Sequence, residues 1–258
     1  MLDITKKLKK EIQNCDSIEE RLEVLKDKYI GETAYVTGCG PSLMELDEDE
    51  LKSKLDGKLV MSMKQSFDVV GSDLCDFHLL NKYNLKPTQY DYGDINNTII
   101  IWGLSKSYQD SQLNKIVSQN RPLDLYIPII NPPYITDEQT INGSLNFDDM
   151  KLLGKRCEVT WGKGTFYELV IPFLYHMGVK DIVTFGFDNH IGKYEHYYGE
   201  KDETSCFPQT GEMEQIINAS PYFYEWCVEN GITLKIFSKL NGLDSRFERI
   251  NSLEEINE

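Results

Sequence analysis

The chain has 258 residues, a formal net charge of -15 and a hydrophobic share of 40%. This length supports one domain with a substantial core. The acidic balance argues against a general nucleic-acid binder, which needs a basic surface. The chain has no long apolar run and no apolar signal-peptide core, so we expect neither a transmembrane segment nor secretion. We therefore expect a cytoplasmic protein, with peripheral attachment to the inner face of the membrane as an alternative.

The six cysteines are scattered along the chain and lack the close pairs of a zinc site. We interpret them as reduced thiols rather than as a disulfide framework. They are Cys15, Cys39, Cys75, Cys157, Cys206 and Cys227.

Residues 1–30 are expected to form an N-terminal helical extension of two helices. Asp16 or Ser17 would cap the second helix. The lysine-rich first helix is interpreted as having a solvated face, with a membrane-surface helix as the alternative. Apolar residues recur at helical spacing in both pieces: Leu2, Ile4, Leu8 and Ile12, then Ile18, Leu22, Leu25 and Tyr29.

Residues 31–258 alternate apolar strand-like runs with helical segments. This alternation predicts an α/β, Rossmann-like, doubly wound and mostly parallel sheet, which forms a nucleotide-binding catalytic domain. A small lid or subdomain is expected in residues 131–160 or 187–212. We expect strands at residues 33–37, 59–63, 74–80, 98–102, 125–130, 181–186 and 232–237, and helices after Gly40 and at residues 164–177 and 213–230.

The first predicted strand runs directly into Gly38-Cys39-Gly40-Pro41-Ser42. Glycines permit a sharp turn and close approach of a ligand, and proline suits the first position of a helix. The following backbone N–H groups and the helix dipole would then bind phosphate. A plain strand-to-helix turn without a ligand is the alternative.

Two features disfavour NAD as the ligand of this turn. A third glycine is missing, and Lys64-Gln65 ends the second strand in place of the acidic residue that holds a ribose diol. A Walker A loop is also absent. Lys64 favours an anionic group, while Asn81, which ends the third strand, offers a donor and an acceptor to a base or a sugar hydroxyl.

Further candidate residues lie in the second half of the chain. Gly164 and Thr165 open a predicted long helix and form a second candidate phosphate site. Asp188 follows the sixth strand, and His190, His196 and Tyr197 lie in the loop after it. These side chains could act as a general base and could stabilise departing phosphate oxygens. His190 and His196 with Asp188 could also ligate a metal, but no cysteine lies within a few residues of them, so a metal site is the alternative and not the prediction. His78 and His176 are interpreted as structural.

Together these motifs resemble the bacterial sialyltransferases of glycosyltransferase family 42. They also resemble a related Rossmann-like family of unknown function that includes the archaeal 6-hydroxymethylpterin pyrophosphokinase. The resemblance covers roughly residues 33–237 and includes the stretch Gly-Val-Lys-Asp-Ile-Val-Thr-Phe-Gly-Phe-Asp at residues 178–188.

The resemblance implies roles for individual residues. Gly38, Cys39, Gly40 and Ser42 would line the nucleotide phosphate and ribose, Gln65 and Asn81 would lie near the nucleotide, and Thr165 would meet the phosphates. Lys64 stands where the sialyltransferases carry Asn. His190 stands where that family has a tyrosine that helps the nucleotide leave, and His196 or Tyr197 lies near the position of the second such tyrosine. The family's catalytic histidine, just before the last helix, is missing here. Glu212 or Glu214 falls in that region.

The resulting hypothesis is a sialyltransferase-like glycosyltransferase. It would transfer a sugar from a nucleotide-activated donor, a CMP-sugar, to a glycan or other acceptor hydroxyl by metal-independent inverting displacement. Its candidate bases are His196, His190 and Glu214. The nucleotide sugar is a co-substrate, so no cofactor is expected, and the resemblance suggests a homo-oligomer. One alternative is a Mg²⁺-dependent pyrophosphokinase-like phosphoryl transferase that uses Asp188 and Asp73 or Asp76. The other is a non-catalytic nucleotide-binding protein.

Overall fold

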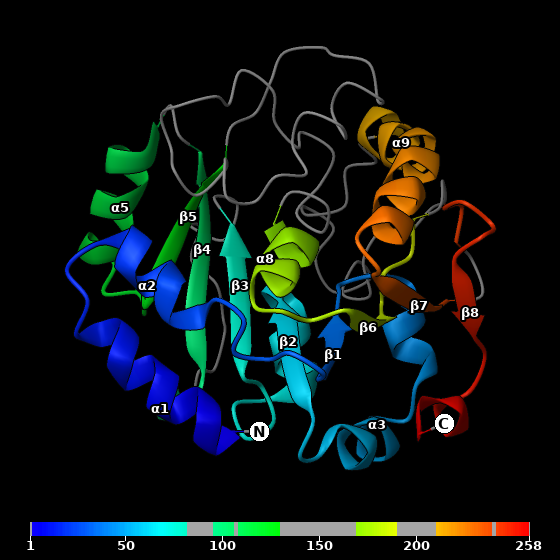
Figure 1. Cartoon of the computed structure of the whole chain (residues 1–258), viewed down its shortest axis with the longest axis horizontal. Helices are drawn as coiled ribbons and strands as arrows, with labels where there is room; N and C mark the ends of the chain where they lie inside the picture. Colours follow the sequence, from blue (N-terminus) through cyan, green and yellow to red (C-terminus); the bar gives the residue numbers. More distant parts are fainter. Residues whose placement is uncertain are drawn as a thin grey trace.

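The computed structural model describes residues 2–81, 95–105, 108–129, 169–189, 210–238 and 241–257. Its centre is an eight-stranded sheet in the order β5-β4-β3-β2-β1-β6-β7-β8, and the pairings between these strands are all parallel (Figure 1). The order reverses at β1, so the fold is doubly wound, as predicted. The strands are β1 (Thr33–Thr37), β2 (Leu59–Met63), β3 (Phe77–Asn81), β4 (Ile99–Ser105), β5 (Leu125–Ile129), β6 (Asp181–Phe185), β7 (Thr233–Phe237) and β8 (Glu248–Ile250).

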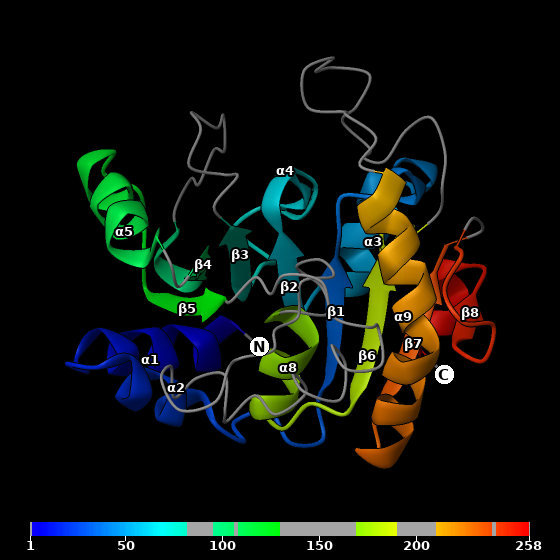
Figure 2. The same ribbon diagram turned by 90° about the horizontal axis from the view of Figure 1, so that it is seen from above.

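Helices cover both faces of the sheet (Figure 2). The α-helices are α1 (Leu2–Gln13), α2 (Ile18–Leu25), α3 (Glu48–Leu55), α4 (Phe67–Val70), α5 (Gln109–Ser118), α8 (Ile171–His176) and α9 (Thr210–Glu229). The short 3₁₀ helices are η1 (Pro41–Glu45), η2 (Lys64–Ser66), η4 (Ile95–Asn97) and η7 (Leu253–Asn257).

Side chains of alternate residues in a strand reach opposite faces, and the core is divided accordingly. Ala34 and Val36 of β1 belong to the cluster that includes apolar residues of α1, α2, α8 and α9. Tyr35 belongs to a second cluster, which includes residues of α3, α4 and η7. Trp102 of β4 packs with Ile116 of α5 in a third cluster. Burial on both faces explains why the strands read as nearly continuous apolar runs.

The seven strands predicted from the sequence are all present, and β8 is the strand that the prediction missed. It has only three residues, too few to show a pattern. Gly178 ends α8 as predicted, with a φ of +87°. The amide of Gly178 donates to Tyr175 O and the amide of Val179 to Leu174 O, each at 3.0 Å, which is a Schellman motif.

The two N-terminal helices also form as predicted, and Ser17 caps α2 in a capping box with Glu20. Two details of α1 differ from the prediction. Ile4, assigned to the apolar stripe, is 49% exposed. Lys9, assigned to a solvated face, is buried, with its ammonium 3.0 Å from Asp124 Oδ2 and 2.6 Å from Thr98 O.

A second polar contact of α1 is made one turn before Lys9, by Thr5. The Thr5 hydroxyl donates to Asp76 Oδ1 at 2.5 Å. Asp76 and Asp124 precede β3 and β5, and their Oδ2 atoms accept from the amides of Val60 and Ile100, each at 2.9 Å. One face of α1 therefore binds two equivalent buried aspartates at the amino edge of the sheet. The predicted lid segments, residues 131–160 and most of 187–212, lie outside the described residues.

Candidate functional site

The turn after β1 packs directly against the turn after β6, at the point where the strand order reverses. The Gly38 amide donates to Phe185 O and the Gly40 amide to Gly186 O, both at 2.7 Å. A Cβ on Gly38 would lie 2.5 Å from Gly186 O, and one on Gly186, whose φ is +63°, would lie 2.6 Å from Gly38 O. The glycines are therefore needed for the close approach of two protein backbones.

Asp188 lies at the beginning of the 3₁₀ helix η1, which starts at Pro41. Its Oδ2 accepts from the Ser42 amide at 2.5 Å, and a Cβ on Gly40 would lie 2.4 Å from the same oxygen. The Asp188 side chain is buried, and its Oδ1 has no hydrogen-bond partner among the residues that the structure describes. Ser42 Oγ lies 3.5 Å from Phe237 O, which ends β7.

These contacts change the interpretation of the glycine turn. The sequence predicted that the backbone amides after Pro41 would bind phosphate. In the structure the amides of Gly38, Gly40 and Ser42 donate within the protein, and a carboxylate stands at the start of η1. The physical reason is that the carbonyl oxygens of Phe185 and Gly186 and the carboxylate of Asp188 accept these hydrogen bonds at the place that the prediction assigned to a ligand.

Ser66 joins the carboxyl ends of β1 and β2. Its hydroxyl lies 2.6 Å from Thr37 O and 2.8 Å from Met63 O, and it accepts from the Met63 amide at 2.9 Å. Thr37 Oγ1 is 3.1 Å away. Ser66 is fully buried. The sequence analysis missed this residue, although its position directly after Lys64-Gln65 could have indicated it.

Lys64 follows β2 in the left-handed region, with a φ of +49°. Its carbonyl lies 2.9 Å from His78 Nε2. Because a carbonyl only accepts, Nε2 carries the proton. The His78 ring is buried in β3, as predicted, and stacks on Phe67 with centroids 4.4 Å apart. Burial lowers the pKa of His78 to about 3, so the ring is neutral near pH 7.

Cys39 bridges the turn and the end of β2. Its thiol donates to Met63 O at 3.2 Å and lies 3.9 Å from Gln65 Oε1. Burial raises the pKa of the Cys39 thiol, and the positive charge of Lys64 opposes that shift. Asn81 ends β3 beside Gly103 of β4 and is 7% exposed.

The segment after β7 lies beside Asp188. The Gly242 amide donates to Asn189 O at 2.6 Å, and Asn241 Nδ2 donates to Phe187 O at 2.6 Å. A Cβ on Gly242 would lie 2.9 Å from Asn189 O. The two loops therefore support each other at the carboxyl edge of the sheet.

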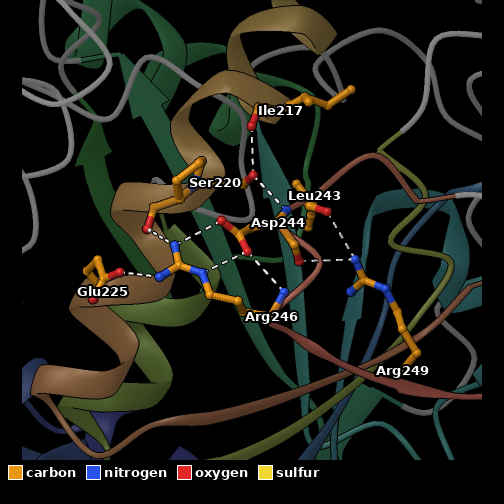
Figure 3. A network of polar contacts seen from close by, with 8 residues as sticks. Ile217, Ser220, Glu225, Leu243, Asp244, Arg246 and Arg249 are labelled. Atoms are coloured by element: carbon orange, nitrogen blue, oxygen red, sulfur yellow. Dashed lines mark hydrogen bonds and ion pairs between the residues drawn. The ribbon is translucent and has the colours of Figure 1, made fainter.

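A polar network fixes the same segment to α9 (Figure 3). The Asp244 amide donates to Ser220 Oγ at 2.8 Å. Arg246 donates to both carboxylate oxygens of Asp244 at 2.9 Å, forms an ion pair with Glu225 and lies over the Tyr224 ring. The Arg246 guanidinium lowers the pKa of Asp244. This network connects the segment after β7 to α9.

Most of the predicted nucleotide-binding residues come together at this edge. Gly38 to Ser42, Lys64, Gln65, Asn81 and Asp188 follow or end β1, β2, β3 and β6. Predicted residues Gly164, Thr165, His190, His196 and Tyr197 lie outside the described residues. Glu214 lies in α9, and its side chain is not described.

The aspartates considered for Mg²⁺ are separated. Asp188 follows β6, whereas Asp73 and Asp76 precede β3. Since the strands are parallel, these residues lie at opposite ends of the sheet, so they do not form one ligand set. Within the described ranges, no group of three or more His, Cys, Asp or Glu side chains could hold a metal. Nor is any helix in those ranges long and apolar enough to span a bilayer.

Comparisons with known proteins found a likeness among solved structures and none among family models or curated proteins. Among solved structures, the sialyltransferase CstII from Campylobacter jejuni, in complex with the substrate analogue cytidine-5'-monophosphate, aligns at a TM-score of 0.42 and 15% identity. The alignment covers 86% of this chain and 91% of that chain.

Proposed function

We propose that the protein is a sialyltransferase-like glycosyltransferase that binds a nucleotide-activated sugar at the carboxyl edge of β1, β2, β3 and β6. The observation that supports this proposal is the cluster of Gly38–Ser42, Lys64, Gln65 and Asn81 at the point where the strand order reverses. Open α/β sheets bind their ligands at this point. The ammonium of Lys64 is complementary to a phosphate, and the side-chain amide of Gln65 or Asn81 is complementary to a base. The uncharged backbone of Gly38–Ser42 is complementary to a sugar.

The proposed reaction is a direct displacement with inversion. A base, for which His196, His190 and Glu214 are the candidates, takes the proton of an acceptor hydroxyl. The hydroxyl oxygen forms a bond to the anomeric carbon while the bond from that carbon to the nucleotide phosphate oxygen breaks. Tyr197 and the histidine that is not the base would donate hydrogen bonds to the departing phosphate, in place of Mg²⁺.

The separation of the aspartates weighs against the pyrophosphokinase alternative. A phosphoryl transferase of that kind needs acidic ligands gathered around Mg²⁺ at the phosphates. Asp188 is the one member of the proposed set at the carboxyl edge, and its Oδ2 already accepts from Ser42. The proposed glycosyl transfer needs no such set of acidic ligands.

The test is the thermal stability of the protein with CMP, UDP, GDP and ATP, each with and without Mg²⁺. We expect CMP to raise the melting temperature without Mg²⁺, because a ligand that binds only the folded state stabilises it. A rise with ATP alone, dependent on Mg²⁺, would contradict the proposal and favour the phosphoryl transferase.

Catalysis is tested separately by the release of CMP from CMP-sialic acid in the presence of an acceptor sugar. We expect His190→Ala and His196→Ala to lose turnover while still binding CMP. Binding of the donor without any turnover by the wild-type protein would instead indicate a non-catalytic nucleotide-binding protein.

A further inference from the structure

Charge is distributed unequally across the candidate site. On the β6 side, the Asp188 carboxylate is buried at the start of η1, with its Oδ1 unpaired among the described residues. The amides of Gly38, Gly40 and Ser42 already have acceptors in the protein. A phosphate placed on the glycine turn would therefore meet a like charge and no available donor from these three amides.

On the β2 side the charge is positive. The described residues that directly follow strands at this edge are 38–40, 64–66, 186–189, 238 and 251–252, and Lys64 is the one lysine or arginine among them. The Cys39 thiol of the glycine turn donates to the carbonyl of Met63, the residue directly before Lys64, so Lys64 lies beside the turn. Burial raises the pKa of this thiol and the positive charge of Lys64 opposes the rise, in a protein whose net charge is -15.

Lys64 is also held in an unusual backbone conformation. A φ of +49° is uncommon for any residue other than glycine, asparagine or aspartate, and such strain persists where the surroundings fix it. Two contacts fix it here. His78 Nε2 donates to the Lys64 carbonyl, and the His78 ring is itself held by stacking on Phe67. Ser66 fixes Met63, the preceding residue, through both its amide and its carbonyl.

We propose that Lys64, positioned by His78, binds the phosphate of the nucleotide on the β2 side of the site. The uncharged part of the nucleotide then lies over the glycine turn, so that no anionic group of the ligand meets the buried Asp188 carboxylate. This assignment rests on the proposed function and deepens it. Lys64 is the anion-binding residue, and His78 is a positioning residue that acts through the Lys64 backbone.

The experiment compares the binding of cytidine and of CMP by calorimetry at low salt. In the wild-type protein, CMP should bind more tightly than cytidine, and added salt should reduce the difference. Lys64→Asn removes the charge but tolerates the left-handed conformation, so the fold should be retained. We expect this variant to weaken CMP binding about tenfold or more and to leave cytidine binding unchanged. Lys64→Arg keeps the charge and should retain most of the affinity for CMP.

The role of His78 is tested by His78→Leu, which removes the donor, and by His78→Gln, whose side-chain amide can replace it. Selective loss of CMP affinity in the leucine variant, with recovery in the glutamine variant, supports the positioning role. If the leucine variant does not fold, Lys64→Asn still decides the assignment of the phosphate.

Two outcomes would overturn the assignment, and they are distinguishable. If Lys64→Asn binds CMP as tightly as the wild-type protein, or loses cytidine and CMP affinity equally, Lys64 does not bind the phosphate, although the proposed function stands. If the wild-type protein binds neither compound nor any other nucleotide tested, the proposed function is wrong, and so is the assignment of the phosphate to Lys64.

Discussion

Asp76 is expected to make the stability of the protein depend on pH. Burial raises the pKa of its carboxyl from 3.8 to about 6, although Thr5 and the Val60 amide donate to it. The folded protein therefore holds this proton more tightly than the unfolded chain. The stability that the proton provides is complete below about pH 3.8 and is lost as the pH rises through about 6.

The size of the effect follows from the shift. A change of about two pKa units corresponds to about 3 kcal/mol in the free energy of unfolding. In Asp76→Asn the amide oxygen can still accept from Val60, and the amide group can donate to Thr5 Oγ1. The variant should therefore gain up to about 3 kcal/mol relative to the wild-type protein between about pH 4 and about pH 7.5.

Asp124→Asn is the matched control. Asp124 occupies the equivalent place before β5 and accepts from the Ile100 amide, but it also pairs with the buried ammonium of Lys9. Removing its charge leaves that ammonium without its counter-ion, so this variant should lose about 3 kcal/mol near neutral pH. Urea unfolding followed by tryptophan fluorescence, at about pH 4 and about pH 7.5, measures both variants. The reasoning is refuted if the stability difference between Asp76→Asn and wild type is the same at both pH values.

Three further variants test the frame of the site. Gly40→Ala should destabilise the protein by about 2–4 kcal/mol in urea unfolding, because its Cβ would displace the buried carboxylate of Asp188; unchanged stability would contradict the packing of the turn. Ser66→Ala should cost about 1–3 kcal/mol, since the Met63 amide loses its acceptor, and a smaller loss would show that Ser66 does not join the strands. Arg246→Gln should speed amide hydrogen exchange in β8 more than in β7, and equal rates would show that the α9 network does not hold this edge strand.

Much of the fold could be predicted from the sequence because the signals for strands and helix ends are local. The β-branched run at residues 98–102 indicates a strand by itself, and the glycine after α8 indicates a helix end by itself. The hydrogen-bond partners of the site residues, in contrast, are distant in sequence. Gly38 and Gly40 indicated a close approach, but their amide acceptors come from Phe185 and Gly186, which no local pattern connects with them.

The same limit applies to the prediction of buried charged side chains. Lys9 looks like any lysine on an amphipathic helix, and only the tertiary fold brings Asp124 next to it. The catalytic residues proposed from the second half of the chain remain predictions, because His190, His196 and Tyr197 lie outside the described residues.

The pairing of β1 with β6 also determines when the site can form. Thr33 pairs with Asp181, so strands β1 to β5 leave the ribosome before β6 is synthesised. Until then, the amides of Gly38, Gly40 and Ser42 lack the acceptors that shape the turn. The candidate site at the carboxyl edge is therefore completed late in biosynthesis, and a chain that ends before β6 would lack it even if its first five strands had paired.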